Sequence, residues 1–244
     1  MTRPKMILFD YGGTLMDGAW EPPRGDEAIL RRAVKNPLGL TPEDLGHFAQ
    51  ELRAELCDPV IALRRELHEW QFTRLLYEML QIEFSIPVEE QERVFFQAAA
   101  IRSEPMPHIK ELLAFLAGRN IRAGVMSNIM SSAGELRRRI EEHFSLSQFD
   151  FIIASSDYGV AKPDPLIFKL ALAKAGLPPE DVWFCGDNPR CDVEGSHAAG
   201  MFPVWYEDLT VESIWRDPSH GAPACPHLHI HDWRELIDIL KELV

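Results

Sequence analysis

The spacing of apolar residues changes along the chain, and it predicts two kinds of structure. Met6 to Phe9 form an unbroken apolar run that is typical of a short buried strand. From Ile109 onward, short apolar runs alternate with stretches in which apolar residues recur every three or four positions, as they do in amphipathic helices. This alternation of strand and helix predicts an α/β fold, a doubly wound parallel sheet with helices on both faces.

The elements of this sheet can be located approximately. Strands are predicted at residues 6–9, 122–126, 149–154, 182–185 and 202–205, with an edge-like final strand at 229–231. Helices are predicted around residues 112–116 and at 133–143, 165–175 and 193–199, and the last helix begins at Trp233. The segment 207–227 contains several prolines and a glycine and predicts an irregular surface excursion.

Helical spacing dominates residues 26–101, where no strand pattern stands out. Thr41 is followed by Pro42 and, at the third position, by Asp44, which is typical of a helix N-terminus. The predicted helices run from there to about residue 56, then over residues 60–80, and then from 88 to 101.

The residues that flank this helical segment predict how the chain is divided. The proline-rich stretch 102–107 resembles a linker. We therefore expect an all-helical domain at residues 17–105, inserted into an α/β core domain made of residues 1–16 and 106–244. The two connections between these domains are expected to act as a hinge.

Composition excludes several kinds of partner. The formal net charge is −13, and the 244-residue chain has a pI near 5.1, which argues against binding to nucleic acid or to an anionic membrane. No apolar run reaches eighteen residues, and the first aspartate comes before a signal-peptide apolar region could form, so we expect a cytoplasmic protein. The four cysteines are too scattered for a disulfide framework and are expected to be reduced. The sequence leaves the oligomeric state open.

Polar residues follow the predicted strands at the points where they end. They are Asp10, Ser127, Asn128, Asp187 and Asp192, together with Lys162 in a turn before a helix. Because carboxyl ends of parallel strands share one edge of a sheet, we expect these side chains to meet there. Asp10 can serve as a nucleophile, Asp10 and Asp187 can share a Mg²⁺ ion, and Lys162 and Ser127 can hold phosphate oxygens. Gly12 and Gly13 let backbone amides approach an anion. The set suits phosphoryl transfer from a small phosphorylated substrate.

Four motifs in order resemble those of the haloacid dehalogenase-like (HAD) superfamily, whose members carry a helical cap on a Rossmann-like core. The motifs are FDYGGTL, MSN, GVAKPDPLIF and CGDNPRCDVEGSHAAGM, and the helical segment stands where the family inserts its cap. The resemblance implies a hydrolase in which Asp10 is the nucleophile, Lys162 balances charge, and Ser127 and Asn128 contact phosphate. It also implies that Asp187 ligates Mg²⁺ directly, that Asp192 helps from the outer shell, and that the carbonyl of Gly12 is a further ligand.

Gly12 departs from the family's phosphatases, which carry a second aspartate at this position as general acid and base. Such a group typically contributes about 10²–10⁴ in rate, or roughly 3–5 kcal/mol of barrier. One hypothesis is a weak or specialised phosphatase in which a cap residue, the Tyr11 hydroxyl, water or the substrate moves the proton.

Two other hypotheses stay open. One is a phosphonatase, for which Lys35 is the single candidate Schiff-base lysine in the cap, or a dehalogenase, against which the retained Asp187 counts. The other is a module that binds a phosphorylated ligand or a partner protein with little or no turnover.

Two further groups of residues are candidates outside these motifs. Cys225, His227, His229 and His231 alternate, so an extended strand would bring them to one face that could bind zinc, although a plain edge strand followed by a helix cap explains them better. In the cap, Arg64, Arg65, His68 and Trp70 fall in one predicted helix, where residues 64 and 68 share a face and could recognise substrate. Trp20 could help to enclose a substrate or simply pack between cap and core.

Overall fold

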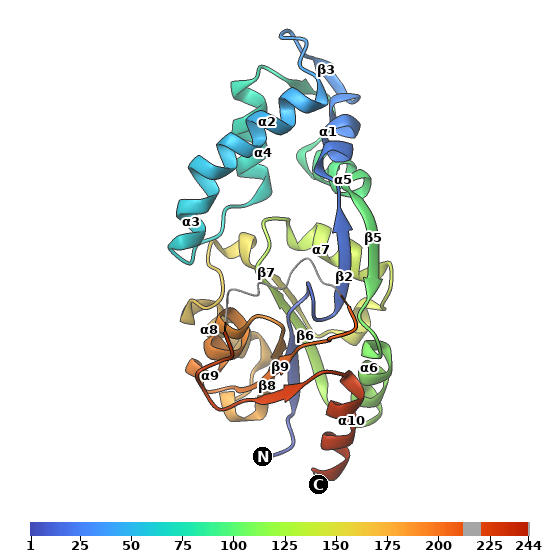
Figure 1. Cartoon of the computed structure of the whole chain (residues 1–244), viewed down its shortest axis with the longest axis vertical. Helices are drawn as coiled ribbons and strands as arrows, with labels where there is room; N and C mark the ends of the chain where they lie inside the picture. Colours follow the sequence, from blue (N-terminus) through green and yellow to red (C-terminus); the bar gives the residue numbers. More distant parts are fainter. Residues whose placement is uncertain (212–220, 244) are drawn as a thin grey trace.

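The computed structural model describes residues 1–211 and 221–243, and its centre is a six-stranded parallel sheet (Figure 1). The strand order is β10-β9-β8-β1-β6-β7, with β1 in the interior. The strands are β1 (Met6–Phe9), β6 (Arg122–Ser127), β7 (Ile152–Ala154), β8 (Val182–Gly186), β9 (Phe202–Tyr206) and β10 (Leu228–Ile230). The predicted doubly wound sheet is confirmed. The chain order reverses between β8 and β1, which is where open α/β sheets bind ligands.

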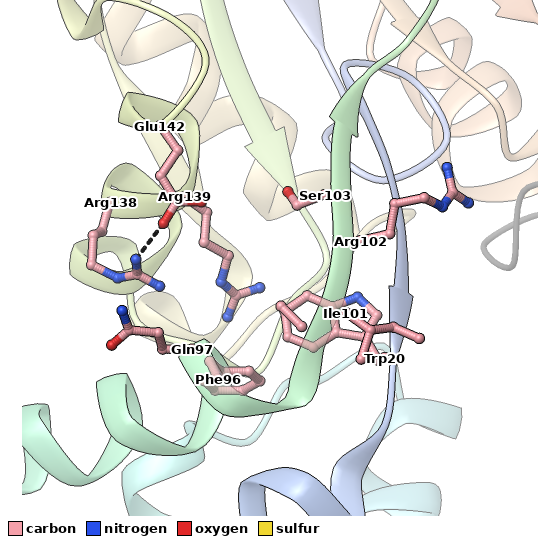
Figure 2. Close-up of a pocket in the computed structure, with 10 residues that line it drawn as sticks. Trp20, Phe96, Gln97, Ile101, Arg102, Ser103, Arg138, Arg139 and Glu142 are labelled. Atoms are coloured by element: carbon pink, nitrogen blue, oxygen red, sulfur yellow. Dashed lines mark hydrogen bonds and ion pairs between the residues drawn. The ribbon is translucent and has the colours of Figure 1, made fainter.

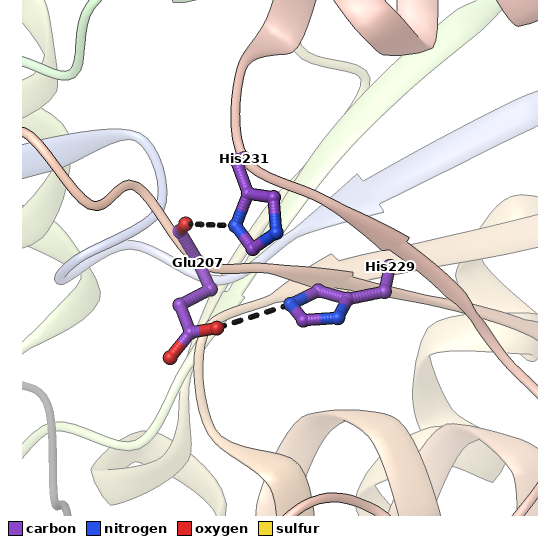
Figure 3. A group of neighbouring side chains, drawn as sticks. All are labelled: Glu207, His229 and His231. Carbon is purple, nitrogen blue, oxygen red and sulfur yellow. Dashed lines mark hydrogen bonds and ion pairs between the residues drawn. The ribbon is translucent and has the colours of Figure 1, made fainter.

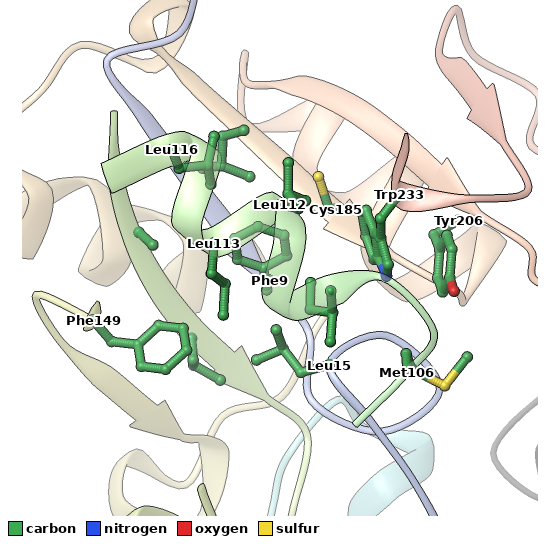
Figure 4. Close-up of a cluster of buried hydrophobic side chains, with 14 of the residues drawn as sticks. Phe9, Leu15, Met106, Leu112, Leu113, Leu116, Phe149, Cys185, Tyr206 and Trp233 are labelled. Atoms are coloured by element: carbon green, nitrogen blue, oxygen red, sulfur yellow. The ribbon is translucent and has the colours of Figure 1, made fainter. Parts of the chain in front are cut away.

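Strand β1 is buried on both faces, because its residues alternate between two apolar clusters. Ile7 and Phe9 belong to the larger cluster, while Met6 and Leu8 belong to the smaller one on the opposite face. In the larger cluster the ring of Phe9 meets Trp233 edge-on, with ring centroids 5.7 Å apart (Figure 4). A short strand thus receives a packed layer on each side.

Helices cover both faces as the alternating pattern predicts. They are α6 (Ile109–Gly118), α7 (Ala133–Glu141), α8 (Pro165–Ala175), α9 (Gly195–Ala198) and α10 (Trp233–Glu242), with a π-helix at Pro189–Glu194 before α9. Buried residues of α6, α7 and α10 lie in the larger cluster, whereas those of α8 lie in the smaller one. Of the irregular segment expected at 207–227, residues 212–220 lie outside the described part of the chain.

Between β1 and α6 the chain forms a separate, mainly helical segment (upper half of Figure 1). Its helices are α1 (Pro22–Leu30), α2 (Pro42–Leu52), α3 (Asp58–Ala62), α4 (Glu69–Met79) and α5 (Val88–Ala99), with a π-helical turn at Arg53–Cys57. The predicted capping box at Thr41 and Asp44 begins α2. This segment has its own apolar cluster, which includes Phe72 and Leu76 from α4.

Three details of this segment differ from the predictions. The helix expected over 60–80 is broken after α3, where Arg64 has a positive φ of 58° and His68 becomes the N-cap of α4, so residues 64 and 68 share no helix face. The segment is not purely helical, because β3 (Ala33–Lys35) pairs with β4 (Glu83–Phe84). The expected linker at 102–107 is largely strand, as described next.

An antiparallel ribbon joins the helical segment to the sheet. Strand β2 (Met16–Trp20) pairs with β5 (Ala100–Pro105), so both connections run side by side. The fully buried Met16 and its neighbour Leu15 anchor the start of this ribbon in the larger cluster. Within the described residues, no helix is both long and apolar enough to cross a membrane.

Candidate active site

Asp10 lies at the carboxyl end of the central strand, between the ends of its two neighbours. Its backbone N–H donates to the carbonyl of Cys185 at 2.9 Å, which extends the ladder with β8 by one residue beyond β1. Ser127 is the last residue of β6, and Asp187 directly follows β8. Because β1 pairs with both strands, these three residues reach the same edge of the sheet. All three side chains are buried.

The ammonium group of Lys162 ties this edge together. Its Nζ donates to Asp10 Oδ1 at 2.6 Å, to Asp192 Oδ1 at 2.6 Å, and to the carbonyl of Met126 at 3.1 Å. The side chain is only 2% exposed, so a charge at this depth requires such partners. Burial lowers the pKa of Lys162, but the charges and hydrogen bonds of Asp10 and Asp192 more than offset this and raise its pKa above the ordinary value. Lys162 is therefore a fixed cation at neutral pH.

The carboxylates exceed the positive charge available from Lys162. One oxygen from each of Asp10, Asp187 and Asp192 lies within 4.8 Å of the others. Burial raises the pKa of Asp10 to about 6, Lys162 partly offsets this, and Asp192 adds to it. Burial, followed by the negative charges of Asp10 and Asp192, raises the pKa of Asp187 well above its ordinary value. A divalent cation with a preference for oxygen ligands would remove this repulsion, so the residues present fit Mg²⁺.

A glycine makes room for Asp192. A Cβ atom built on Gly186 would lie 2.3 Å from Asp192 Oδ2, so a side chain there would displace the carboxylate. The same oxygen accepts a hydrogen bond from the Asn188 N–H at 3.0 Å, which leaves Oδ1 for Lys162. The sequence predicts Asp192, but it does not reveal this need for glycine at residue 186.

Asn128 is part of the site in an unexpected way. Its side-chain nitrogen donates to the Lys162 carbonyl at 2.9 Å, and its side-chain oxygen accepts from the Lys162 N–H at 2.7 Å. Both polar ends of the amide are thus used on the backbone of the lysine. Asn128 therefore positions Lys162, a role that no feature of the sequence indicates.

Tyr11 points away from Asp10. Its buried side chain belongs to the larger apolar cluster together with Phe9, as period-two alternation along an extended strand requires. Burial raises the pKa of the Tyr11 hydroxyl, and the polar neighbours that influence it include Ser103 and Arg139. The side chain of Tyr11 therefore does not join Asp10 and Lys162, although the Tyr11 backbone N–H donates to the Asp10 carboxylate. Gly12 is partly exposed and forms an isolated bridge with Met16.

A cavity of about 210 Å³ lies beside the β2–β5 ribbon (Figure 2). Ser103 and Arg139 line it together with Trp20, and Asp10 is not part of its wall. The guanidinium of Arg139 lies 4.9 Å from the centre of the Trp20 ring, so Trp20 at the end of β2 packs against α7. This contact agrees with the packing role considered for Trp20.

Three of the cap residues singled out in the sequence contact the sheet side of the molecule directly, and the fourth, Trp70, is linked to it through Glu92. The Arg64 carbonyl accepts from the Ala161 N–H at 3.1 Å. Arg65 pairs with Asp164 at 2.5 Å, and His68 lies 3.4 Å from Asp157.

The Trp70 indole N–H donates to Glu92 at 2.9 Å, and that carboxylate accepts from the Ser132 N–H and hydroxyl at 2.7 Å each. Glu92 carries no signal in the sequence that would reveal this link.

The fold and the buried Asp–Lys–Asp edge define a class of hydrolases, and a comparison with known families identifies it. The haloacid dehalogenase-like hydrolase family model matches residues 4–200, so the chain belongs to this family and is a hydrolase, as predicted.

Among its relatives, the chain is 31% identical to the phosphoserine phosphatase of Thermus thermophilus over 86% of this chain and 80% of that protein. It is 28% identical to the N-acetylmuramic acid 6-phosphate phosphatase of Pseudomonas aeruginosa over 98% of this chain and 95% of the relative. Among solved structures, it is similar to a 2-haloacid dehalogenase from Pseudomonas syringae, with a TM-score of 0.61 and 25% identity, covering 99% of this chain and 100% of that one.

Proposed function

We propose that this chain is a Mg²⁺-dependent phosphatase that acts on a small phosphorylated metabolite through an aspartyl-phosphate on Asp10. The observation that carries the proposal is the buried edge where Lys162 Nζ lies 2.6 Å from both Asp10 and Asp192, with the Asp187 carboxylate in the same group. The similarity to two phosphatases along most of the chain supports the same activity. The Mg²⁺ requirement, the small substrate and the cytoplasmic location expected from the sequence are parts of this proposal.

The proposed chemistry uses a few groups of the chain. A carboxylate oxygen of Asp10 forms a bond to phosphorus while the bond from phosphorus to the ester oxygen breaks. Lys162 balances the charge of Asp10 and of the bound phosphate, and the Ser127 hydroxyl can donate to a phosphate oxygen. Mg²⁺, when held by Asp10, Asp187 and the Gly12 carbonyl with Asp192 outside them, supplies the positive charge that a phosphate needs among three carboxylates.

The leaving oxygen needs a proton, and residue 12 has no side chain to supply it. Tyr11 faces the apolar cluster, so water, the substrate or a polar cap residue is left to provide it. Water then forms a bond to phosphorus while the bond from phosphorus to the Asp10 oxygen breaks, which releases phosphate, restores the Asp10 carboxylate, and passes one proton of the water to solvent or phosphate. We propose residues 17–105 as the cap and residues 1–16 with 106–244 as the core, which places the division in the β2–β5 ribbon.

An assay with p-nitrophenyl phosphate tests this function. The wild-type chain is expected to release p-nitrophenol with Mg²⁺ and to lose this activity in EDTA. Asp10→Asn keeps the shape of the side chain but removes the nucleophile, so it should abolish turnover. A panel of phosphate esters would then identify the preferred substrate. A wild-type chain without turnover on any ester would instead support the binding module.

Gly12 and the likeness to a 2-haloacid dehalogenase favour one second candidate, attack of Asp10 on a halogen-bearing carbon. Release of halide from a 2-haloacid in EDTA would support it. The group of three carboxylates weighs against it, because carbon attack has no use for a divalent cation.

A further inference from the structure

A second group of metal-ligating side chains lies at the β9–β10 edge of the sheet, on residues that the phosphatase proposal does not use. Glu207 directly follows β9, and His229 and His231 lie in and just after β10. One ligand atom from each of the three lies within 4.8 Å of the others. Figure 3 shows the carboxylate and the two imidazole rings gathered on one side of the strand pair.

Strand geometry explains why these residues meet. His229 and His231 are two residues apart in extended chain, so they emerge on the same face. In the parallel register of β10 and β9, His229 lies opposite Trp205, and the Glu207 N–H donates to the Ile230 carbonyl at 2.9 Å. Glu207 therefore comes next to His231 on the face shared by the two histidines.

The ring nitrogens are already arranged for metal binding. His231 Nδ1 lies 2.8 Å from the Glu207 carbonyl oxygen, which can only accept, so Nδ1 carries the hydrogen and Nε2 keeps its lone pair. A hydrogen bond of this kind is the usual partner of a metal-bound histidine. His229 Nε2 donates a hydrogen bond to Glu207 Oε2 at 3.1 Å, and Zn²⁺ would take the place of this proton between the two atoms. Two ligand atoms on a tetrahedral Zn²⁺ at about 2.0–2.1 Å are themselves about 3.3 Å apart, so this spacing already suits an ion.

The His229 ring is also held in place. It stacks on Trp205, with ring centroids 3.9 Å apart and an interplanar angle of 14°. Trp205 is fixed in turn, because its indole N–H donates to the Asp187 carbonyl at 3.1 Å. A ligand ring that is oriented before binding loses little entropy when the metal arrives.

We propose that Glu207, His229 and His231 form a Zn²⁺ site, separate from the Asp10 carboxylates, with a fourth position open to solvent. Two imidazoles and a carboxylate are typical zinc ligands, whereas Mg²⁺ prefers oxygen ligands alone. The two other residues of the alternating stretch are not ligands. Cys225 and His227 offer no ligand atom to the group of three.

Zn²⁺ binding to the full chain tests the proposal, measured by equilibrium dialysis in excess Mg²⁺ so that the carboxylate site is occupied by its own ion. We expect one Zn²⁺ per chain in the wild type. Loss of an outer-sphere partner typically weakens metal binding about 10–100-fold, so His229→Gln and His231→Gln should each weaken it by at least about tenfold. His227→Gln, the matched control on the same strand face, should bind as the wild type does.

A second control separates the two sites. Asp187→Asn should leave Zn²⁺ binding unchanged even if it abolishes phosphatase activity, so failure of one proposal does not imply failure of the other. Circular dichroism of each variant establishes that it is folded. The proposal is overturned if the wild type binds no Zn²⁺, if folded His229→Gln binds as the wild type does, or if binding is lost in Asp187→Asn or His227→Gln.

Discussion

Raising the pH should destabilise the metal-free chain at the Asp10 site. The pKa of Asp10 is about 6 in the folded chain and 3.8 in the unfolded chain, so the folded state holds the proton more tightly. Its contribution to stability is complete below about pH 4 and is lost as the pH rises through about 6. The difference of about two pKa units corresponds to about 3 kcal/mol in the free energy of unfolding. Asp187 shifts in the same direction, and Lys162 stays protonated throughout this range.

Mg²⁺ should reverse this loss, because it replaces the protons that relieve repulsion among the carboxylates. At a concentration about 100 times its dissociation constant, an ion that binds only the folded state adds about 2.7 kcal/mol. Urea unfolding between pH 4 and 8, in EDTA and in Mg²⁺, measures both effects. Glu69 and Asp26, with pKa values raised to about 7 and about 6, titrate in the same pH range as Asp10. The pH dependence of the wild type must therefore be compared with that of Asp10→Asn, which keeps both of these groups.

The wild type should lose about 3 kcal/mol more than Asp10→Asn between pH 4 and 7 in EDTA, and the gap should close in Mg²⁺. Asp187→Asn should abolish the stabilisation by Mg²⁺. Parallel pH profiles of wild type and Asp10→Asn, or a wild type that Mg²⁺ does not stabilise, would refute the reasoning about this site.

Three further predictions concern single side chains. Gly12 has no positive φ, so Gly12→Asp should fold. Because an alkoxide leaving group needs a proton, the variant should raise the kcat for an alkyl phosphate ester by about 10²–10⁴, as a general acid typically does; an unchanged or lower kcat in a folded variant would contradict this. Lys162→Met should lower the kcat for p-nitrophenyl phosphate by about 10²–10³, because a fixed positive charge that stabilises the transition state is lost. A Lys162→Met variant with wild-type kcat would show that Lys162 does not balance the charge of Asp10 and phosphate. Burial raises the pKa of Glu69 from 4.5 to about 7, so the charged form of Glu69 destabilises the folded chain above pH 7. Glu69→Gln should therefore increase the free energy of unfolding by about 3 kcal/mol at pH 8 and leave it unchanged at pH 4. Urea unfolding at the two pH values checks this.

Much of the sheet can be predicted because its signals are local. Helix α8 was expected over the residues it occupies, since Asp164 caps it, Pro165 opens it, and Gly176 ends it in the left-handed region. The break after α3 could not be predicted in this way. Apolar spacing continues across residues 63–67, and the chain leaves the helix there because the Arg64 carbonyl and the Glu69 N–H bond to groups far along the chain. The ribbon depends likewise on pairing between strands about 85 residues apart.

At the candidate site, charge was easier to predict than orientation. Asp10, Lys162 and Asp187 stand at strand ends or turns where a charged residue has few structural reasons to be, and the structure brings them together. Residues 9 and 11 are two apart in extended chain, so their spacing predicts that Tyr11 faces the core together with Phe9. The resemblance to the family motif suggests the opposite, that the Tyr11 hydroxyl reaches the site. The role of Asn128 depends on a tight turn at Lys162 that no spacing rule reveals.

Many contacts between the helical segment and the sheet side are polar, and this bears on how the missing acid at residue 12 can be tolerated in the proposed phosphatase. The apolar cluster around Phe72 is separate from the two clusters that flank β1. The links across the boundary include hydrogen bonds and ion pairs, such as Glu92 to Ser132 at 2.7 Å and Glu66 to Ser155 at 2.9 Å. The boundary also includes apolar contacts, because Met130 packs against the Phe72 cluster and the guanidinium of Arg139 lies 4.3 Å from the centre of the Phe96 ring. A bound substrate would add contacts at this boundary, and in the proposed mechanism it is also one of the remaining sources for the proton that Gly12 cannot give. We therefore expect substrates that carry their own acidic hydrogen near the ester oxygen to be turned over faster than those that do not.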